Sequence, residues 1–192
     1  MSNMLISRRA FIATAGAGAG LWIVRRSLGA HEAHAGAISV PADVTIVEFS
    51  DQGVRGITVH VPMVVKSESD WRKQLSAEAF EVTRHGETEY PFTGAYWNEH
   101  AKGLYRCVCC ATALFSSIHK FDSGTGWPSF WRPIADENVA GPARRHALAP
   151  SETEVKCRRC DAHLGDCFDD GPAPTGLRYC IDSVSLRFVK AA

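Results

Sequence analysis

The sequence has no surplus of charge of either sign, no long hydrophobic run and no internal repeat. Its 21 basic residues equal its 21 acidic residues, so the overall charge does not favour capture of nucleic acid or of an anionic membrane. With 45% hydrophobic and 22% charged residues, the composition excludes disordered and collagen-like classes. The length of 192 residues fits one globular domain preceded by a leader.

The N-terminal segment has the composition of an export signal. Arg8 and Arg9 precede a weakly hydrophobic stretch that ends near Val24, which is shorter than the about 20 apolar residues of a membrane span. Twin arginines before such a stretch resemble a twin-arginine signal, with a cleavage site at 33–35. We expect a signal peptide over 1–35 and a periplasmic protein, exported in the folded state and without stable membrane association. The alternative is an uncleaved anchor on the outer face of the inner membrane.

Residues 36–65 are expected to form an N-terminal extension ahead of the main domain. β-branched residues cluster over 44–49 and again over 56–61, on either side of a turn sequence that contains Gly53. Short runs of this kind separated by turn residues predict two strands that pair as a β-hairpin.

The main domain is expected to span 66–192, with helices first and strands after them. Apolar residues at helical spacing over 69–83 predict one bent helix or two short ones, with Ser69 and Ser76 as N-caps. After Pro91 the helical spacing disappears, and short β-branched and aromatic runs alternate with glycine and proline. This pattern predicts a mainly β domain with antiparallel strands.

Seven cysteines are many for this length, and four of them have the spacing of a metal site. They form two Cys-x-x-Cys pairs, Cys107 with Cys110 and Cys157 with Cys160. Four thiolates on two such turns are typical of a closed, tetrahedral, structural zinc site, and we expect one Zn²⁺. Two disulfides are the alternative, because the expected compartment is oxidising. Cys109, next to Cys110, competes as a ligand, but only the 107/110 choice gives two matching turns.

A zinc ion with four protein ligands has no open position for a substrate, so the catalytic group is sought among Cys109, Cys167 and Cys180. A strand, a loop rich in glycine and proline, and a return strand would bring His163 close to Cys180. Arg178 lies two residues before Cys180 and therefore shares its face of the strand, where its charge lowers the pKa of the thiol. His163 would supply a proton or orient a substrate. The alternative is a Cys180 that serves as a small buried hydrophobe.

From about residue 69 to the C-terminus, the sequence resembles the type B methionine sulfoxide reductases. Four runs carry this resemblance in the expected order: GLYRC at 103–107, FDSGTGWPSF at 121–130, CRRCDAHLG at 157–165 and DGPAPTGLRYC at 170–180. The resemblance implies a zinc-bound fold that is mainly β, with two small antiparallel sheets and short N-terminal helices. It also implies reduction of the R epimer of methionine sulfoxide in oxidised proteins by a monomeric enzyme that uses a thioredoxin-like thiol donor.

The resemblance assigns roles to individual residues. Cys180 corresponds to the nucleophile, Arg178 to the residue that activates it, and Trp127, Phe130 and His163 to substrate-binding residues. Attack of a thiolate on the sulfoxide sulfur requires protonation of the sulfoxide oxygen, because that oxygen is a poor leaving group. Methionine is then released and Cys180 remains as a sulfenic acid.

The sequence departs from the family pattern at three positions. Asp166 replaces a histidine that helps to protonate the sulfoxide oxygen, and Asp182 replaces an asparagine. Two ionised carboxylates would raise the pKa of Cys180, so we expect one of them, Asp166, to stay protonated and to act as the acid. Thr125 stands where many members carry a resolving cysteine. We therefore expect an external thiol to reduce the sulfenic acid, with Cys109 or Cys167 as the alternative resolving group.

Two other functions compete with this interpretation. A catalytically impaired, zinc-stabilised binding module of the same fold would explain the two aspartates, because a fold does not determine a function. It would not need Cys180, Arg178 and Trp127 together. A thiol-disulfide oxidoreductase is the other alternative, but both Cys-x-x-Cys pairs are assigned to the metal.

Overall fold

The computed structural model describes residues 42–141 and 152–191, all of which belong to one unit, Ser39–Ala192. The predicted signal peptide, 1–35, lies outside the described residues. Within the described ranges, no helix is both long enough and apolar enough to cross a membrane.

The described chain begins with a β-hairpin where the sequence predicts one. Strand β1 (Asp43–Phe49) pairs antiparallel with β2 (Arg55–Pro62), and Val47 lies opposite Thr58. Strand β2 is mostly exposed, whereas the middle of β1 is buried. The amide of Asn138 donates to the carbonyl of Val47 and its oxygen accepts from the N–H of Val47, so this distant residue anchors the hairpin to the rest of the unit.

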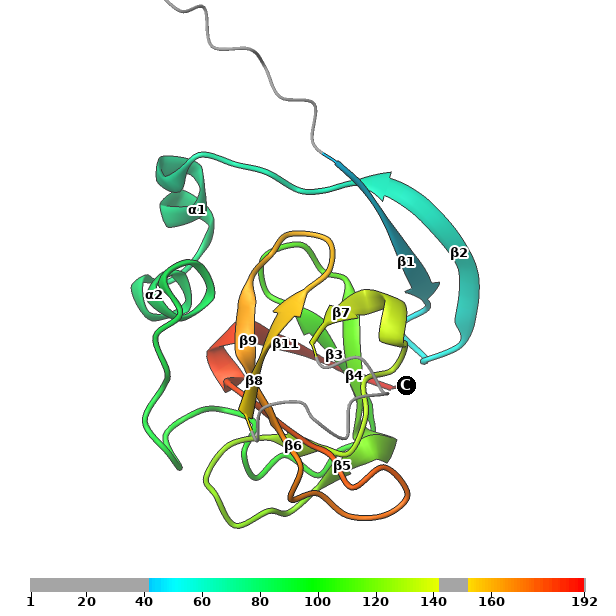
Figure 1. Ribbon diagram of the computed structural model, residues 1–192. Helices are drawn as coiled ribbons and strands as arrows, with labels where there is room; N and C mark the ends of the chain where they lie inside the picture. Colours follow the sequence, from blue (N-terminus) through cyan, green and yellow to red (C-terminus); the bar gives the residue numbers. More distant parts are fainter. Residues whose placement is uncertain (1–41, 142–151, 192) are drawn as a thin grey trace, which may run out of the picture. The chain divides into compact units, whose positions relative to one another are not determined.

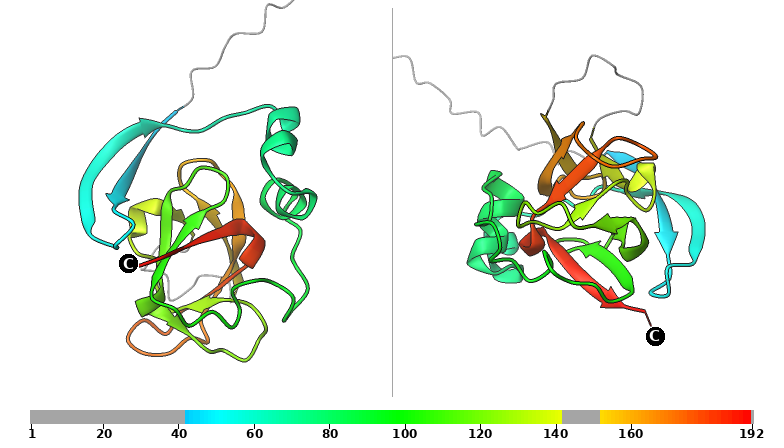
Figure 2. Two further views of the ribbon diagram at one scale, coloured as in Figure 1. Left: turned by 180° about the vertical axis from the view of Figure 1, so that it is seen from behind. Right: turned by 90° about the horizontal axis from the view of Figure 1, so that it is seen from below.

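Two short helices follow the hairpin and lie side by side in Figures 1 and 2. They are α1 (Glu68–Gln74) and α2 (Ala77–His85), so the predicted helical segment is two helices. Ser76 caps α2 as predicted, but α1 is capped by Ser67 and not by Ser69, because the Ser67 hydroxyl accepts from the N–H of Asp70. The buried rings of Trp71 and Phe80 attach the pair to the core.

The strands form two further antiparallel sheets, which confirms the predicted fold class. A three-stranded sheet has the order β11-β3-β4, built from Leu186–Lys190, Gly103–Cys107 and Ala113–Ser116. A six-stranded sheet has the order β5-β6-β10-β9-β8-β7, built from Lys120–Phe121, Ser129–Phe130, Arg178–Ile181, His163–Phe168, Glu152–Cys157 and Val139–Ala140. Three single 3₁₀ turns, η1 to η3, lie at Ser117–His119, Asp136–Asn138 and Ser183–Ser185.

Aromatic side chains join the two sheets. Phe115 of β4 stacks on Phe130 of β6 with ring centroids 4.5 Å apart, and Tyr105 of β3 meets Phe130 edge-on at 5.0 Å. All three rings are fully buried, and each contributes about 1.5–3 kcal/mol of hydrophobic stabilisation. Phe130, predicted to contact substrate, is thus a core residue that supports β6 from inside.

Candidate functional site: a four-cysteine cluster and a half-buried thiol

The two Cys-x-x-Cys pairs form matching turns at the ends of β3 and β8. In each turn, the N–H of the fourth following residue, Ala111 or Asp161, donates to the carbonyl of the first cysteine, Cys107 or Cys157. Ala111 and Asp161 both have positive φ angles, of 62° and 54°. The same local conformation therefore occurs twice, and the two turns meet although β3 and β8 belong to different sheets.

The four sulfurs fit a tetrahedral metal ion. The Sγ atoms of the two pairs all lie within 4.8 Å of one another, with Cys110 and Cys157 at 3.5 Å and Cys107 and Cys160 at 3.6 Å. Zinc–sulfur bonds of about 2.3 Å at tetrahedral angles place neighbouring sulfurs about 3.8 Å apart, which matches this spacing. All seven cysteines are unpaired, and a disulfide would require about 2.05 Å. Cys109 is not part of this four-sulfur group, and its Sγ lies 3.5 Å from the Thr83 hydroxyl.

Cys180 occupies the middle of the six-stranded sheet. It lies opposite Asp166 on β9 and opposite Ser129 on β6, and its Sγ is 3.9 Å from the hydroxyl of Thr125. The close approach of β9 requires a glycine: a Cβ on Gly165 would come within 2.2 Å of the Cys180 carbonyl, and its φ of 136° also suits only glycine. The strand and the return strand thus place Asp166 directly opposite Cys180, with Arg178 two residues before Cys180 on β10.

Arg178 lies beside Cys180 but is held by other groups. Its guanidinium donates two hydrogen bonds to the carboxylate of Asp170, at 2.8 and 2.9 Å, and lies 4.4 Å from the ring centroid of Phe168. Burial raises the pKa of the Cys180 thiol, and the charge of Arg178 and the hydroxyl of Thr125 lower it only in part. Arg178 does lower the pKa of Cys180, as expected, but burial has the larger effect, so the pKa is raised overall. Cys180 therefore rests as a thiol.

His163 is fixed by a residue that the sequence analysis missed. Its Nδ1 lies 2.9 Å from Oε1 of Glu154 on the neighbouring strand β8. Its Nε2 is buried without a hydrogen-bond partner and points toward Asp182, whose Oδ2 lies 3.9 Å away. Glu154 lies three residues before the second Cys-x-x-Cys pair, and this position was the available clue in the sequence. The pairing of β8 with β9 brings Glu154 into contact with His163.

Burial raises the pKa of both Asp166 and Asp182, to different degrees. Asp182 is only 2% exposed, and its Oδ1 accepts the N–H of Glu89. Burial raises its pKa to about 7, and the negative charges of Glu89, Asp166 and Glu78 add to this effect. Burial also raises the pKa of Asp166, which is only half-buried. Asp182 is therefore the more strongly perturbed of the two carboxyl groups.

Glu89 is a second residue that the sequence analysis missed. Its buried carboxylate accepts the N–H of Ser183 at 2.7 Å and that of Val184 at 3.1 Å, just after Asp182. Its carbonyl accepts the indole N–H of Trp127 at 3.1 Å. Glu89 thus connects the predicted substrate-binding tryptophan to the turn that carries Asp182. No pattern in the sequence distinguishes it from Glu87, which is exposed.

Cys167 lies on β9 next to Asp166, and its side chain points to the face of the sheet opposite to that of Cys180. It pairs with Tyr179, whereas its neighbour Asp166 pairs with Cys180, so the side chains of Cys167 and Cys180 point to opposite faces of the sheet. Cys167 is only 3% exposed, and burial raises the pKa of its thiol to about 12. A resolving cysteine must reach Cys180 and react as a thiolate. The position of Cys167 and its raised pKa both argue against that role.

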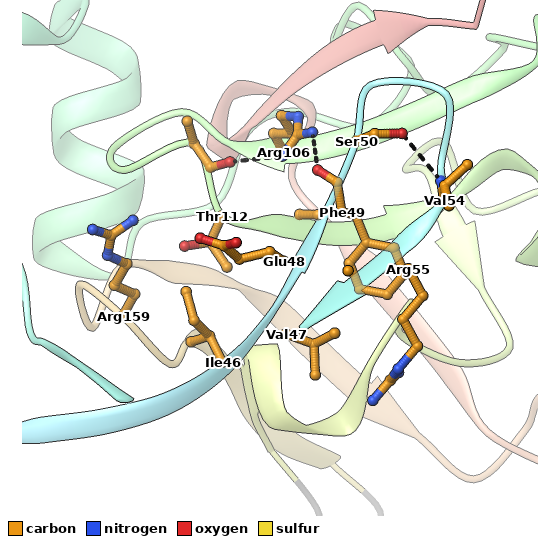
Figure 3. Close-up of a pocket in the computed structure, with 13 residues that line it drawn as sticks. Ile46, Val47, Glu48, Phe49, Ser50, Val54, Arg55, Arg106, Thr112 and Arg159 are labelled. Carbon is orange, nitrogen blue, oxygen red and sulfur yellow. Dashed lines mark hydrogen bonds between the residues drawn. The ribbon is translucent and has the colours of Figure 1, made fainter. Parts of the chain in front are cut away.

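A separate cavity of about 490 Å³ lies beside the hairpin and is shown in Figure 3. Glu48, Arg106 and Arg159 line it, but no cysteine does. Arg106 donates to the carbonyl of Phe49 at 2.8 Å and to the carboxylate of Asp51 at 2.7 Å, so its guanidinium fastens the hairpin to β3. The cavity is therefore separate from the candidate thiol of Cys180.

Comparison with known proteins places these features in a family. Residues 75–190 match the SelR domain family, and this range includes both Cys-x-x-Cys turns and Cys180. A protein of Herminiimonas arsenicoxydans named peptide methionine sulfoxide reductase MsrB is 54% identical over 125 residues, which cover 65% of this chain and 90% of that protein. A protein of the same name from Hahella chejuensis is 51% identical over 129 residues, covering 67% and 91%. Peptide methionine sulfoxide reductase B1, chloroplastic, from Oryza sativa subsp. japonica is 52% identical over 124 residues, covering 65% and 58%.

Proposed function

We propose a mechanism for this chain from the premise that it belongs to the SelR domain family and is a peptide methionine sulfoxide reductase. The substrate is the R epimer of methionine sulfoxide in proteins, and Cys180 is the nucleophile. The observation that carries this proposal is the position of Cys180 in the middle of a sheet, with Thr125, Arg178 and Asp182 around its sulfur. Trp127 provides an aromatic face for the methyl group of the sulfoxide.

The reaction transfers one oxygen atom from the substrate sulfur to Cys180. The Cys180 sulfur donates an electron pair to the sulfoxide sulfur, and the sulfoxide oxygen receives a proton. The attack forms a bond between the two sulfurs. The oxygen then passes to the Cys180 sulfur, where a new sulfur–oxygen bond forms as the sulfur–oxygen bond of the substrate and the bond between the two sulfurs break, and methionine leaves, reduced by two electrons. Cys180 is oxidised by two electrons and carries the oxygen as a sulfenic acid. Because Cys180 rests as a thiol, its own proton must also leave the sulfur before or during the attack.

The protonating group is assigned to Asp182, acting with His163. Asp182 is the more deeply buried of the two aspartates and has a pKa of about 7, where a carboxyl group both holds and releases a proton at neutral pH. His163 Nε2 has no hydrogen-bond partner and lies 3.9 Å from Oδ2 of Asp182, and the other ring nitrogen of His163 is held by Glu154. Asp166, opposite Cys180, remains the second candidate for this acid.

The sulfenic acid is reduced by a thiol from outside the chain. The hydroxyl of Thr125, in the loop before β6, lies 3.9 Å from the Cys180 sulfur and cannot form a disulfide. Cys167 points to the other face of the sheet. A thioredoxin-like dithiol supplies two thiols, so that Cys180 returns to a thiol, the donor becomes a disulfide and water is released.

The metal has a structural part in this proposal. The cluster of two matching Cys-x-x-Cys turns would hold one Zn²⁺, which joins β3 to β8 and leaves no open ligand position for substrate. The twin arginines near the N-terminus support export of the folded, metal-loaded protein to the periplasm. A monomer that acts on oxidised periplasmic proteins is the form we propose.

An assay with separated epimers tests the proposal. The zinc-loaded protein and its Cys180→Ser variant are incubated with a dithiol and with peptides that carry either the R or the S sulfoxide, and methionine is measured. We expect methionine from the R epimer only, and none with the variant. A Cys180→Ser variant with unchanged turnover would refute the mechanism. A wild-type protein that binds the peptide without turnover would instead support the binding-module alternative.

A further inference from the structure

Three exposed aromatic side chains gather in one loop near the proposed site. Tyr90, Phe92 and Trp97 lie within eight residues of one another and are 82%, 54% and 38% exposed. The other large hydrophobic side chains that are exposed among the described residues are aliphatic, namely Val54, Ile57, Val65 and Ile118. An exposed aromatic cluster of this kind is typical of a binding surface.

The loop is fastened directly to the segment that carries Trp127. The N–H of Phe92 donates to the carbonyl of Gly126 at 2.9 Å, and a Cβ on Gly126 would come within 2.8 Å of the Phe92 ring. Phe92 has a φ of 65°, a conformation that costs energy for a bulky residue and is retained mainly at functional sites. The structure thus holds this ring at the surface, where it meets Trp97 edge-on at 5.3 Å.

Two cavities that share two lining residues lie between Trp97 and the side chains next to Cys180. One, of about 110 Å³, is lined by Trp97 together with Phe121 and Asp122. The other, of about 380 Å³, is lined by the same Phe121 and Asp122 and also by Thr125 and Arg178. Thr125 and Arg178 are neighbours of the Cys180 sulfur. The second cavity therefore lies beside two neighbours of Cys180 and shares Phe121 and Asp122 with the cavity that Trp97 lines.

We propose that Tyr90, Phe92 and Trp97 form a subsite for a large apolar side chain close in sequence to the methionine sulfoxide. The ligand is an extended polypeptide segment whose oxidised methionine reaches Cys180 while a neighbouring aromatic or aliphatic residue packs on the exposed rings. Edge-on or offset ring contacts add to hydrophobic burial, so an aromatic neighbour binds best. This inference rests on the proposed function and defines which peptides the same site prefers.

A binding measurement with the zinc-loaded Cys180→Ser protein tests the subsite without turnover. The probes are peptides with one methionine (R)-sulfoxide and either phenylalanine, serine or lysine nearby, moved stepwise along the sequence on both sides. At the preferred position, we expect the phenylalanine peptide to bind about two- to tenfold more tightly than the serine peptide. Trp97→Ala in this background removes that preference, Trp97→Phe restores most of it, and Ile57→Ser on the hairpin is the matched control that leaves it unchanged.

The outcomes separate this inference from the proposed function. Equal affinity for the three peptides at every position, or an unchanged preference in Trp97→Ala, would overturn the subsite even if the enzyme reduces sulfoxides. Tighter binding of the lysine peptide would overturn it too and would assign recognition to the acidic side chains of the two cavities, such as Asp122. Absence of turnover in the wild type alongside a Trp97-dependent preference would retain the subsite and reject the proposed chemistry.

Discussion

Replacing Asp182 by asparagine removes the proton of the most perturbed carboxyl group and keeps its shape. The amide oxygen still accepts the N–H of Glu89, so the local hydrogen bond survives. In the wild type, burial raises the pKa of Asp182 from 3.8 to about 7, which corresponds to about 4 kcal/mol at most. The folded state binds this proton more tightly than the unfolded state. Its stabilisation is therefore complete below pH about 4 and is lost as the pH rises to about 7.

Urea denaturation of the zinc-loaded proteins at several pH values measures this effect. We expect the free energy of unfolding of the wild type to fall relative to that of Asp182→Asn between pH about 4 and 7, by up to about 4 kcal/mol. The difference between the two proteins cancels the pH dependence of metal binding. Asp166→Asn is the matched control and should show a smaller change, because Asp166 is only half-buried.

The same variant tests the assignment of the acid. If Asp182 donates the proton, kcat of the wild type falls as the pH rises through about 7, and Asp182→Asn loses about 10²-fold in kcat together with that transition. Parallel curves of stability against pH for the wild type and Asp182→Asn would refute the burial argument. A pH transition in kcat that survives in Asp182→Asn and disappears in Asp166→Asn would transfer the role to Asp166.

Three further predictions concern single contacts. Glu154→Gln weakens the charged hydrogen bond that orients His163, worth about 1.5 kcal/mol, so kcat should fall about tenfold with little change in KM; equal kcat values would contradict this role. Asn138→Ala removes three buried hydrogen bonds and should lower the free energy of unfolding by about 3 kcal/mol in urea titrations; a loss within error would show that the hairpin is not anchored there. Metal analysis should find one zinc per chain in Cys109→Ser but a loss of zinc and a lower Tm in Cys110→Ser, and zinc retention by both variants would exclude the ligand set.

Short sequence patterns determine the turns, the strand faces, the hairpin and one helix cap of this protein. Two equal Cys-x-x-Cys spacings predict two equal turns, because the turn geometry depends on a few consecutive residues. The alternation of side chains along a strand predicts that Arg178 and Cys180 share a face and that Cys167 faces away from Asp166. The positions of the hairpin and of the Ser76 cap follow from equally short signals.

Tertiary structure alone decided the depth at which each group lies, and hence its protonation. Phe130 is a core residue, Glu89 is buried and binds the backbone beyond Asp182, and burial raises the pKa of Cys180 in spite of Arg178. The desolvation of a group depends on atoms from segments far apart in the sequence. A short sequence motif therefore cannot predict how deeply that group is buried. The sequence therefore determined local relations such as the shared face of Arg178 and Cys180. Only the assembled sheets decided the distant contacts of Glu89 and Glu154 and the direction in which each pKa shifts.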